Sequence, residues 1–90
     1  MDKATLLKEA LELVTGDRNE THGDAREQLG HTAAFWSVYL GVHITSEQVA
    51  VCNILQKVSR SCHGRTNLDD ARDIIGYAAI WGELMEEPDA

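Results

Sequence analysis

Apolar residues recur at spacings of three and four along most of the chain, and this periodicity restricts the fold more than any other feature of the sequence. Such spacing places the apolar residues on one face of an α-helix. β-Branched residues never alternate with polar ones over a window long enough for a strand, and glycine and proline are scarce inside the periodic segments. The sequence therefore predicts an all-α fold.

The first two helices are bounded by recognisable start and stop residues. One is expected over residues 3–15, with Gly16 placed to end it. The next should begin at Asp24, which can form a capping-box-like pair with Glu27, and continue to about residue 40. Their expected core-facing residues are Leu6, Leu7, Ala10, Leu11 and Val14 in the first, and Leu29, Ala33, Trp36 and Leu40 in the second.

The last two helices repeat the same logic. Thr45 as N-cap, with Gln48 three positions later, opens a helix that ends before Gly64. Asn67, with Asp70 three positions later, opens the fourth. Their expected core-facing residues are Val51, Ile54, Leu55, Val58 and Cys62 in the third, and Ile74, Tyr77, Ala78, Trp81 and Leu84 in the fourth.

The length of 90 residues and the short connections predict a single domain, residues 1–90, built as a compact antiparallel four-helix bundle. Residues 1–2 and 86–90 are expected to fray. A chain this small removes only a modest share of its surface from water, so we expect it to form a homo-oligomer. Phe35 and Tyr39 widen the apolar stripe of the second helix and are candidates for contacts with a partner subunit.

The net charge argues against duplex nucleic acid as a partner, and the short apolar runs argue against a membrane location. The net charge is −7, and no run of Lys or Arg offers the basic surface that duplex nucleic acid requires. An acidic surface can serve solubility or, in an inhibitor, imitate nucleic acid. No apolar run approaches the ~20 residues of a membrane span and no signal-peptide pattern is present, so we expect no membrane association and a cytoplasmic location.

A cluster of polar residues on the third and fourth helices is the main candidate site. Asn53, Lys57 and Arg60 fall on one flank of the third helix at 100° per residue. Asp70 and Asp73 fall on the apolar face of the fourth helix, where a carboxylate needs a partner. If the two helices are antiparallel, Asp73 can bond to Lys57 or Arg60. This arrangement is either a preorganised anion site or only an ion-pair network between helices.

Two further features could contribute to anion binding. The loop from Gly16 to Gly23 leads into a helix N-terminus and carries Arg18 and His22, which could contact a phosphate. Its alternative interpretation is an ordinary polar loop. Trp36 and Tyr77 are expected in the core or at a subunit interface, and would stack on a base only if they border the flank with Lys57 and Arg60.

Metal and nucleophilic chemistry find less support. The four histidines form no pair at ligand spacing, so we expect neither zinc nor another resident cofactor. Magnesium would require clustered carboxylates, and only Asp69, Asp70 and Asp73 qualify. No serine lies in a Gly-x-Ser-x-Gly setting, and neither cysteine has a histidine partner in sequence, so no catalytic nucleophile is expected.

Several motifs together resemble an uncharacterised family of small helical phage and prophage proteins, over roughly residues 12–84. They are Gly16-Asp17-Arg18, His22-Gly23-Asp24, the segment from Ala34 to Gly41 that reads AFWSVYLG, Ile44-Thr45, Lys57-x-x-Arg60, and Asp73-Ile74-Ile75-Gly76-Tyr77-Ala78. This resemblance implies a location in the cytoplasm of a host cell, and it implies no particular activity.

A more distant resemblance suggests a chemistry. Asp70-x-x-Asp73 is similar to the second carboxylate pair of MazG-like all-α nucleoside triphosphate pyrophosphohydrolases and of nucleotide-modification-associated domains. Their first pair, Glu-x-x-Glu, has Lys57-x-x-Arg60 as its nearest equivalent here. Replacing metal-binding carboxylates by cations implies a site that holds phosphate directly, which puts hydrolysis through magnesium in doubt.

The leading hypothesis is a binder of a nucleotide-like phosphorylated ligand that does not turn it over, and that could sequester a cyclic nucleotide signal of host immunity. The expected contacts come from Lys57 and Arg60 first, then from Asn53, Arg18, His22, Asp73, Tyr77 and Trp36. One alternative is a magnesium-dependent pyrophosphohydrolase that uses Asp69, Asp70 and Asp73. The other is an acidic protein that inhibits a host defence complex by direct interaction.

Overall fold

The computed structural model describes residues 1–16, 24–64 and 66–86, and these ranges contain four α-helices, one 3-10 turn and no strand. The elements are α1 (Lys3–Thr15), α3 (Ala25–Leu40), α4 (Ser46–Arg60), η1 (Ser61–His63) and α5 (Leu68–Glu86). The predicted all-α fold with four helices is confirmed. None of the helices in these ranges is long and apolar enough to cross a lipid bilayer.

Side chains at the helix starts explain the boundaries. Thr45 and Gln48 form the expected capping box, with hydrogen bonds of 3.2 Å from the Gln48 amide and 2.9 Å to the Gln48 side chain. The Asn67 side chain accepts a hydrogen bond of 2.7 Å from the Asp69 amide and so begins α5. Asp24 caps α3 as expected, but it accepts its hydrogen bond from the amide of Arg26, at 3.3 Å, and not through a pair with Glu27.

Asp2 and Glu86 mark the outer ends of the first and last helices. Asp2 is the N-cap of α1, and its carboxylate accepts a hydrogen bond of 2.8 Å from the Thr5 amide. Glu86 is the last residue of α5. Both residues therefore belong to the helical framework, because a capping side chain and a continued turn satisfy backbone groups that would otherwise face water. Residues 87–90 lie outside the described residues.

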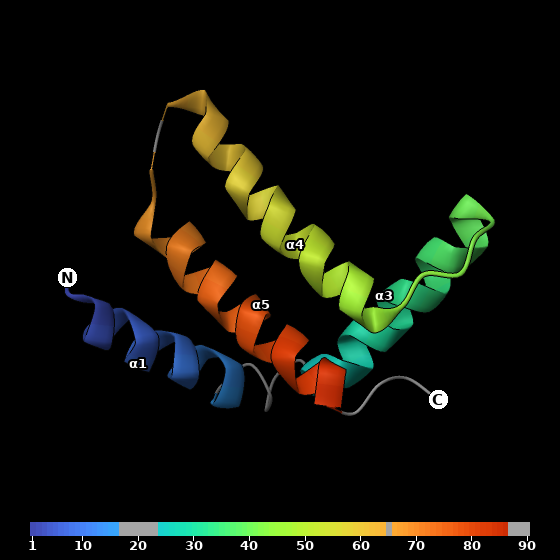
Figure 1. Ribbon diagram of the computed structural model, residues 1–90, viewed down its shortest axis with the longest axis horizontal. Helices are drawn as coiled ribbons and strands as arrows, with labels where there is room; N and C mark the ends of the chain where they lie inside the picture. The colour runs from blue at the N-terminus through green and yellow to red at the C-terminus, as the bar shows by residue number, and fades with distance from the viewer. Residues whose placement is uncertain (17–23, 65, 87–90) are drawn as a thin grey trace.

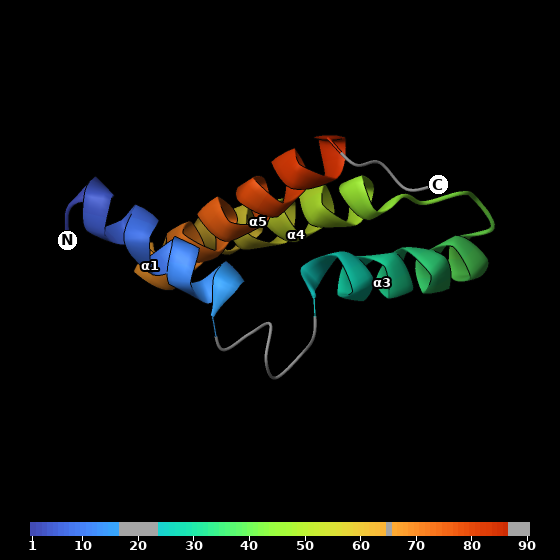
Figure 2. The ribbon, with the colours of Figure 1, turned by 90° about the horizontal axis from the view of Figure 1, so that it is seen from below.

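The helices form two layers. α4 and α5 run antiparallel and side by side, as Figure 1 shows. α1 lies along α5, and α3 lies across the first turns of α4 and the end of α5, so that in Figure 2 α1 and α3 occupy one layer below α4 and α5. The second half of α3 extends beyond the α4/α5 pair (Figures 1 and 2).

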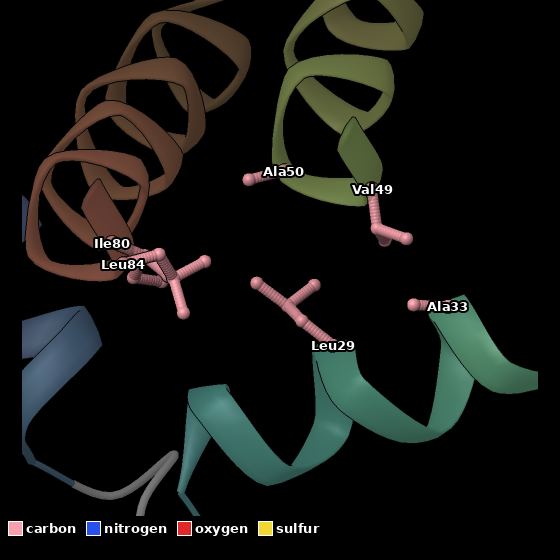
Figure 3. Packing of buried hydrophobic residues seen from close by; sticks show 6 residues of the cluster. All are labelled: Leu29, Ala33, Val49, Ala50, Ile80 and Leu84. Carbon is pink, nitrogen blue, oxygen red and sulfur yellow. The ribbon is translucent and has the colours of Figure 1, made fainter. Parts of the chain in front are cut away.

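The core forms where α3, α4 and α5 meet. Side chains from the three helices point toward one another there (Figure 3), and the buried ones are Leu29, Ala33, Val49, Ala50, Ile80 and Leu84. Half-buried side chains such as Trp36, Tyr77 and Trp81 surround this cluster. α1 contributes Val14 to its edge, while its own buried residue is Ala10. The core is small for a domain of this length, because two of its six members are alanine.

The buried side of α4 is rotated from the expected one. Val49 and Ala50 are fully buried, whereas Leu55 is 59% exposed, Val58 is 46% exposed and Cys62 is also exposed. The reason is that α3 and α5 both pack on the side of α4 that carries Val49 and Ala50, which leaves its most apolar flank uncovered. The expected core residues that are exposed on the other helices are Leu7, Leu11, Leu40 and Ala78.

α1 is attached to α5 by a close approach and an ion pair. Gly76 is buried under α1, where a Cβ atom would lie 3.0 Å from Cγ1 of Val14. Arg72 on α5 lies 2.7 Å from the Glu9 carboxylate on α1. The small residue lets the helix axes come close, and the guanidinium fixes their register.

The connection from α3 to α4 is tied to α3 by one hydroxyl group. The Ser37 Oγ accepts a hydrogen bond of 2.8 Å from the Ile44 amide and donates one of 2.7 Å to the carbonyl of Ala33. Gly41 ends α3 with a left-handed backbone, φ 72°, a conformation that residues with a side chain rarely adopt. The turn therefore has a defined path back to the start of α4.

Candidate functional site

Two ion pairs join α4 to α5 near the end at which the two helices are connected. The Nζ atom of Lys57 lies 3.0 Å from Oδ2 of Asp73, and Nη1 of Arg60 lies 3.0 Å from Oδ1 of Asp70. The two cations lie three positions apart on α4, and the two carboxylates lie three positions apart on α5. Because the helices are antiparallel, Lys57 pairs with Asp73 and Arg60 pairs with Asp70. Of the two partners expected for Asp73, Lys57 or Arg60, the structure shows Lys57.

The exposure of these four side chains indicates how much each ion pair contributes to stability. Lys57 is 17% exposed, Asp70 17% and Asp73 27%, whereas Arg60 is 56% exposed. The Lys57–Asp73 pair is thus shielded from solvent, and the Arg60–Asp70 pair is closer to a surface salt bridge, which is worth little. The pairs are formally neutral, so an anion would be held by directed hydrogen bonds and not by excess positive charge.

Both cations keep hydrogen-bonding capacity beyond their ion pairs. A lysine ammonium has three N–H donors and an arginine guanidinium has five. The contacts described above engage one donor nitrogen of each residue, with Asp73 and Asp70. The remaining donors have fixed positions because the carboxylates orient the two head groups. This is the property that an anion site built from paired cations requires.

A cavity of about 210 Å³ opens beside this cluster, between the end of α4 and the start of α5. It is lined by Lys57, Ser61, Thr66, Asn67 and Asp70 together with Val58, Ala71 and Ile74, and most of the surface that they expose to the cavity is apolar. A mostly apolar pocket with a few polar groups suits a ligand that combines a charged group with a flat apolar one.

Sequence reasoning missed the three uncharged polar residues of this cavity, Ser61, Thr66 and Asn67. All three belong to the connection between the helices, where periodicity gives no orientation. The signal that could have indicated them is their position directly after Arg60 and before Asp70, which the ion pair brings together. Part of their hydrogen-bonding capacity is already used, since the Ser61 hydroxyl donates to the Val58 carbonyl and Asn67 accepts from the Asp69 amide.

The other expected site residues are not gathered around the cavity. Asn53 is half-buried one turn before Lys57, and Trp36 packs against the core from α3. Tyr77 also packs against the core, and it lines with Asp73 only a cavity of about 10 Å³ on the side of α1. Neither aromatic ring lines the cavity beside Lys57. Arg18 and His22 lie outside the described residues.

A second cavity of about 220 Å³ lies between the end of α1, the start of α3 and the end of α5. Its charged residues are Asp24, Arg26 and Glu83. Two carboxylates against one guanidinium do not favour a phosphate group, so the cavity beside Lys57 is the better anion site.

The carboxylates considered for magnesium are each engaged by a cation. Asp69 pairs with Arg72, Asp70 with Arg60 and Asp73 with Lys57. The hydrogen bond to Asp69, together with the interactions with Glu9, raises the pKa of Arg72 above its ordinary value. Within residues 1–16, 24–64 and 66–86, no three acidic, histidine or cysteine side chains are close enough together to hold a metal ion.

Comparison with known proteins identifies relatives in phages. A family model described as a domain of unknown function (DUF6378) matches residues 5–85. The chain is 37% identical over 86 residues to the Gene 55 protein of Mycobacterium phage L5, covering 94% of this chain and 54% of that protein. It is 34% identical over 84 residues to the Gene 55 protein of Mycobacterium phage D29, covering 93% and 56%. No solved structure matches the chain.

These matches confirm the expected resemblance to a family of small phage proteins. The resemblance to MazG-like pyrophosphohydrolases stays a prediction. The chain spans about half the length of the curated relatives that it matches.

Proposed function

We propose that this chain, which belongs to the family described as a domain of unknown function (DUF6378), binds a nucleotide-like phosphorylated ligand without turning it over. The supporting observation is the cavity of about 210 Å³ with Lys57 in its wall and a carboxylate partner behind that lysine. The ligand's phosphate group would accept hydrogen bonds from Lys57 and from the Asn67 and Thr66 side chains. The base or sugar would lie against Val58 and Ile74.

The role assigned to Arg60 follows from its exposure. Its guanidinium is more than half exposed and lies outside the cavity wall, held by Asp70. We assign it to a second phosphate group or to the outer edge of the ligand, where a planar fork of donors binds phosphate well. Asp73 acts as a positioning residue, because it touches Lys57 and does not line this cavity.

Binding without hydrolysis is supported by the state of the carboxylates. A magnesium-dependent pyrophosphohydrolase would need several carboxylates free to coordinate metal ions. Here Asp69, Asp70 and Asp73 would each have to leave a cation first. Because the relatives are phage proteins, we extend the proposal to sequestration of a cyclic nucleotide that signals host immunity.

The direct test mixes the purified protein and Mg²⁺ with nucleoside triphosphates and cyclic di- and oligonucleotides, then measures free ligand by mass spectrometry before and after the protein is denatured. A ligand that disappears from solution and returns intact supports the proposal. Conversion to a monophosphate or a linear product would favour the pyrophosphohydrolase. If no ligand is depleted, the proposal fails and the acidic protein-interaction inhibitor becomes the better hypothesis.

Substitution of the lysine assigns the site. Lys57→Ala should weaken binding by about 10- to 100-fold, the effect of losing one charge-assisted hydrogen bond to a phosphate. Lys8→Ala, at an exposed position on α1, is the matched control and should bind normally. A thermal melt must accompany both, since leaving Asp73 half-buried without its partner should cost about 1–2 kcal/mol of stability. A folded Lys57→Ala that binds as tightly as the control would refute the site assignment.

A further inference from the structure

The second half of α3 and the turn after it expose a group of large apolar side chains, here called the α3 face. Phe35 is 74% exposed, Val38 84%, Tyr39 89% and Val42 57%. At 100° per residue, Val38 lies on the side of α3 opposite to Leu29 and Ala33. The α3 face is therefore a second apolar surface of this helix, separate from the side that packs in the core.

The position of α3 explains why the protein's own chain leaves these residues uncovered. The core contacts of α3 come from its first half, through Leu29 and Ala33. Its second half continues beyond the α4/α5 pair (Figures 1 and 2). The Cα radius of gyration, 13.9 Å, exceeds the roughly 12 Å of a compact domain of this length, in keeping with a helix that projects.

The stretch of sequence that carries the α3 face contains no charged residue. Residues 28–46, between Glu27 and Glu47, contain no Asp, Glu, Lys or Arg, although 26% of all residues in the chain are charged. Depletion of charged residues together with exposed Phe and Tyr is typical of the centre of a protein–protein interface. Surfaces kept in water are usually protected by charge, so an uncharged apolar stretch of this length indicates a docking surface.

The area of the α3 face is close to what a stable dimer needs. At the exposed fractions given above, its four residues present on the order of 550 Å², against about 800 Å² per partner in an interface of standard size. The exposed side chains of His31 and Ala34, on the same half of the helix surface, can supply much of the difference.

We propose that the α3 face binds the α3 face of a second copy of this chain, which makes the protein a two-fold symmetric dimer. Each copy carries a net charge of −7, so two copies repel each other over most of their surfaces. They can meet closely only where charge is absent, and the α3 face is such a place. A basic partner would instead be drawn to the acidic surfaces. A face that pairs with itself also closes the assembly at two copies.

The dimer contact is separate from the proposed ligand site. The α3 face lies beside the start of α4, whereas Lys57 and the cavity lie at the other end of that helix. Failure of one proposal therefore leaves the other intact, and each can be tested with substitutions that do not touch the other surface.

The test measures the molar mass of the full chain by sedimentation velocity and light scattering, with Val38→Glu as the disrupting variant. The unmodified protein should have twice the 10.0 kDa chain mass. Val38→Glu should have the single-chain mass, with its dimer Kd raised at least about 100-fold because two carboxylates are brought together in an apolar contact. Val38 is 84% exposed and glutamate favours helix, so the monomer should keep its helical circular dichroism.

Leu55→Glu is the matched control, since it places the same charge at an apolar residue of α4 that is 59% exposed. It should leave the dimer unchanged. A monomeric unmodified protein at tens of micromolar would overturn the proposal, and would leave the α3 face as a surface for a different protein. Dissociation by Leu55→Glu with a persistent dimer in folded Val38→Glu would overturn it as well, and would move the interface to α4.

Discussion

The stability of the start of α1 depends on pH through the side chain of Asp2. Its hydrogen bond from the Thr5 amide holds the pKa of Asp2 below 3.8. A carboxyl group whose pKa is lowered on folding contributes stability above its unfolded pKa and loses that contribution as the pH falls through the lowered value. The charge on the cap therefore stabilises α1 at neutral pH, and this contribution is lost in strong acid.

Asp2→Ala should reduce the stability of α1 at neutral pH, because the Thr5 amide loses its acceptor. The difference from the unmodified protein should shrink as the pH falls below 3.8, because the contribution of the charge is lost once Asp2 is protonated in the folded state. Thermal melts followed by circular dichroism at neutral and acidic pH measure it. Asp2→Asn keeps a capping side chain without the charge and is the control. A difference that persists unchanged in acid would contradict the role given to the Asp2 charge.

Single residues were predictable from the sequence where helical periodicity fixes their direction. It placed Lys57 and Asp73 on facing flanks, and the ion pair between them follows from that. It could not orient Ser61 or Thr66, because the connection between α4 and α5 has no periodicity. Periodicity also predicted the side of α3 on which Trp36 lies, but not which residues pack against that side. The position of the ring relative to the cations depended on how α3 crosses α4.

Among the helices, α1 packs on α5 through one close approach, where Gly76 lies against Val14. Gly76→Leu should destabilise the protein by about 1–3 kcal/mol, because a side chain there meets Val14. At Gly82, on the same helix, a Cβ atom would meet no other atom within 4 Å, so Gly82→Ala should stabilise by about 0.5–1 kcal/mol through helix propensity. Chemical denaturation measures both. Equal effects of the two substitutions would show that α1 does not pack on α5 as described.

The helix boundaries were predictable because caps and glycine stops are local signals, and the buried side of α4 was not. Its most apolar flank, with Leu55 and Val58, was expected to face the core. Burial is decided by which side the neighbouring helices occupy, and that depends on contacts far apart in the chain. The helices pack through Val49 and Ala50, small side chains that allow both α3 and α5 to approach.

For the whole molecule, net charge sets the response of the proposed dimer to salt. Two copies of charge −7 repel, and salt screens that repulsion, so dimer Kd should fall several-fold as NaCl rises from about 0.05 M to about 0.5 M. Sedimentation equilibrium of the unmodified protein measures this. A complex held by attraction between opposite charges responds in the other direction. A dimer that weakens with salt would therefore rule out an uncharged interface between like-charged copies.

The Ser37 hydroxyl also determines whether the turn after α3 becomes ordered during folding or during binding. Its hydrogen bonds to Ile44 and Ala33 order residues 41–45 within a single chain. The conformational entropy of this turn is therefore lost during folding, and a partner that docks on the α3 face does not have to order it. A serine in the last turn of α3 thus orders the chain beside the α3 face before any partner binds.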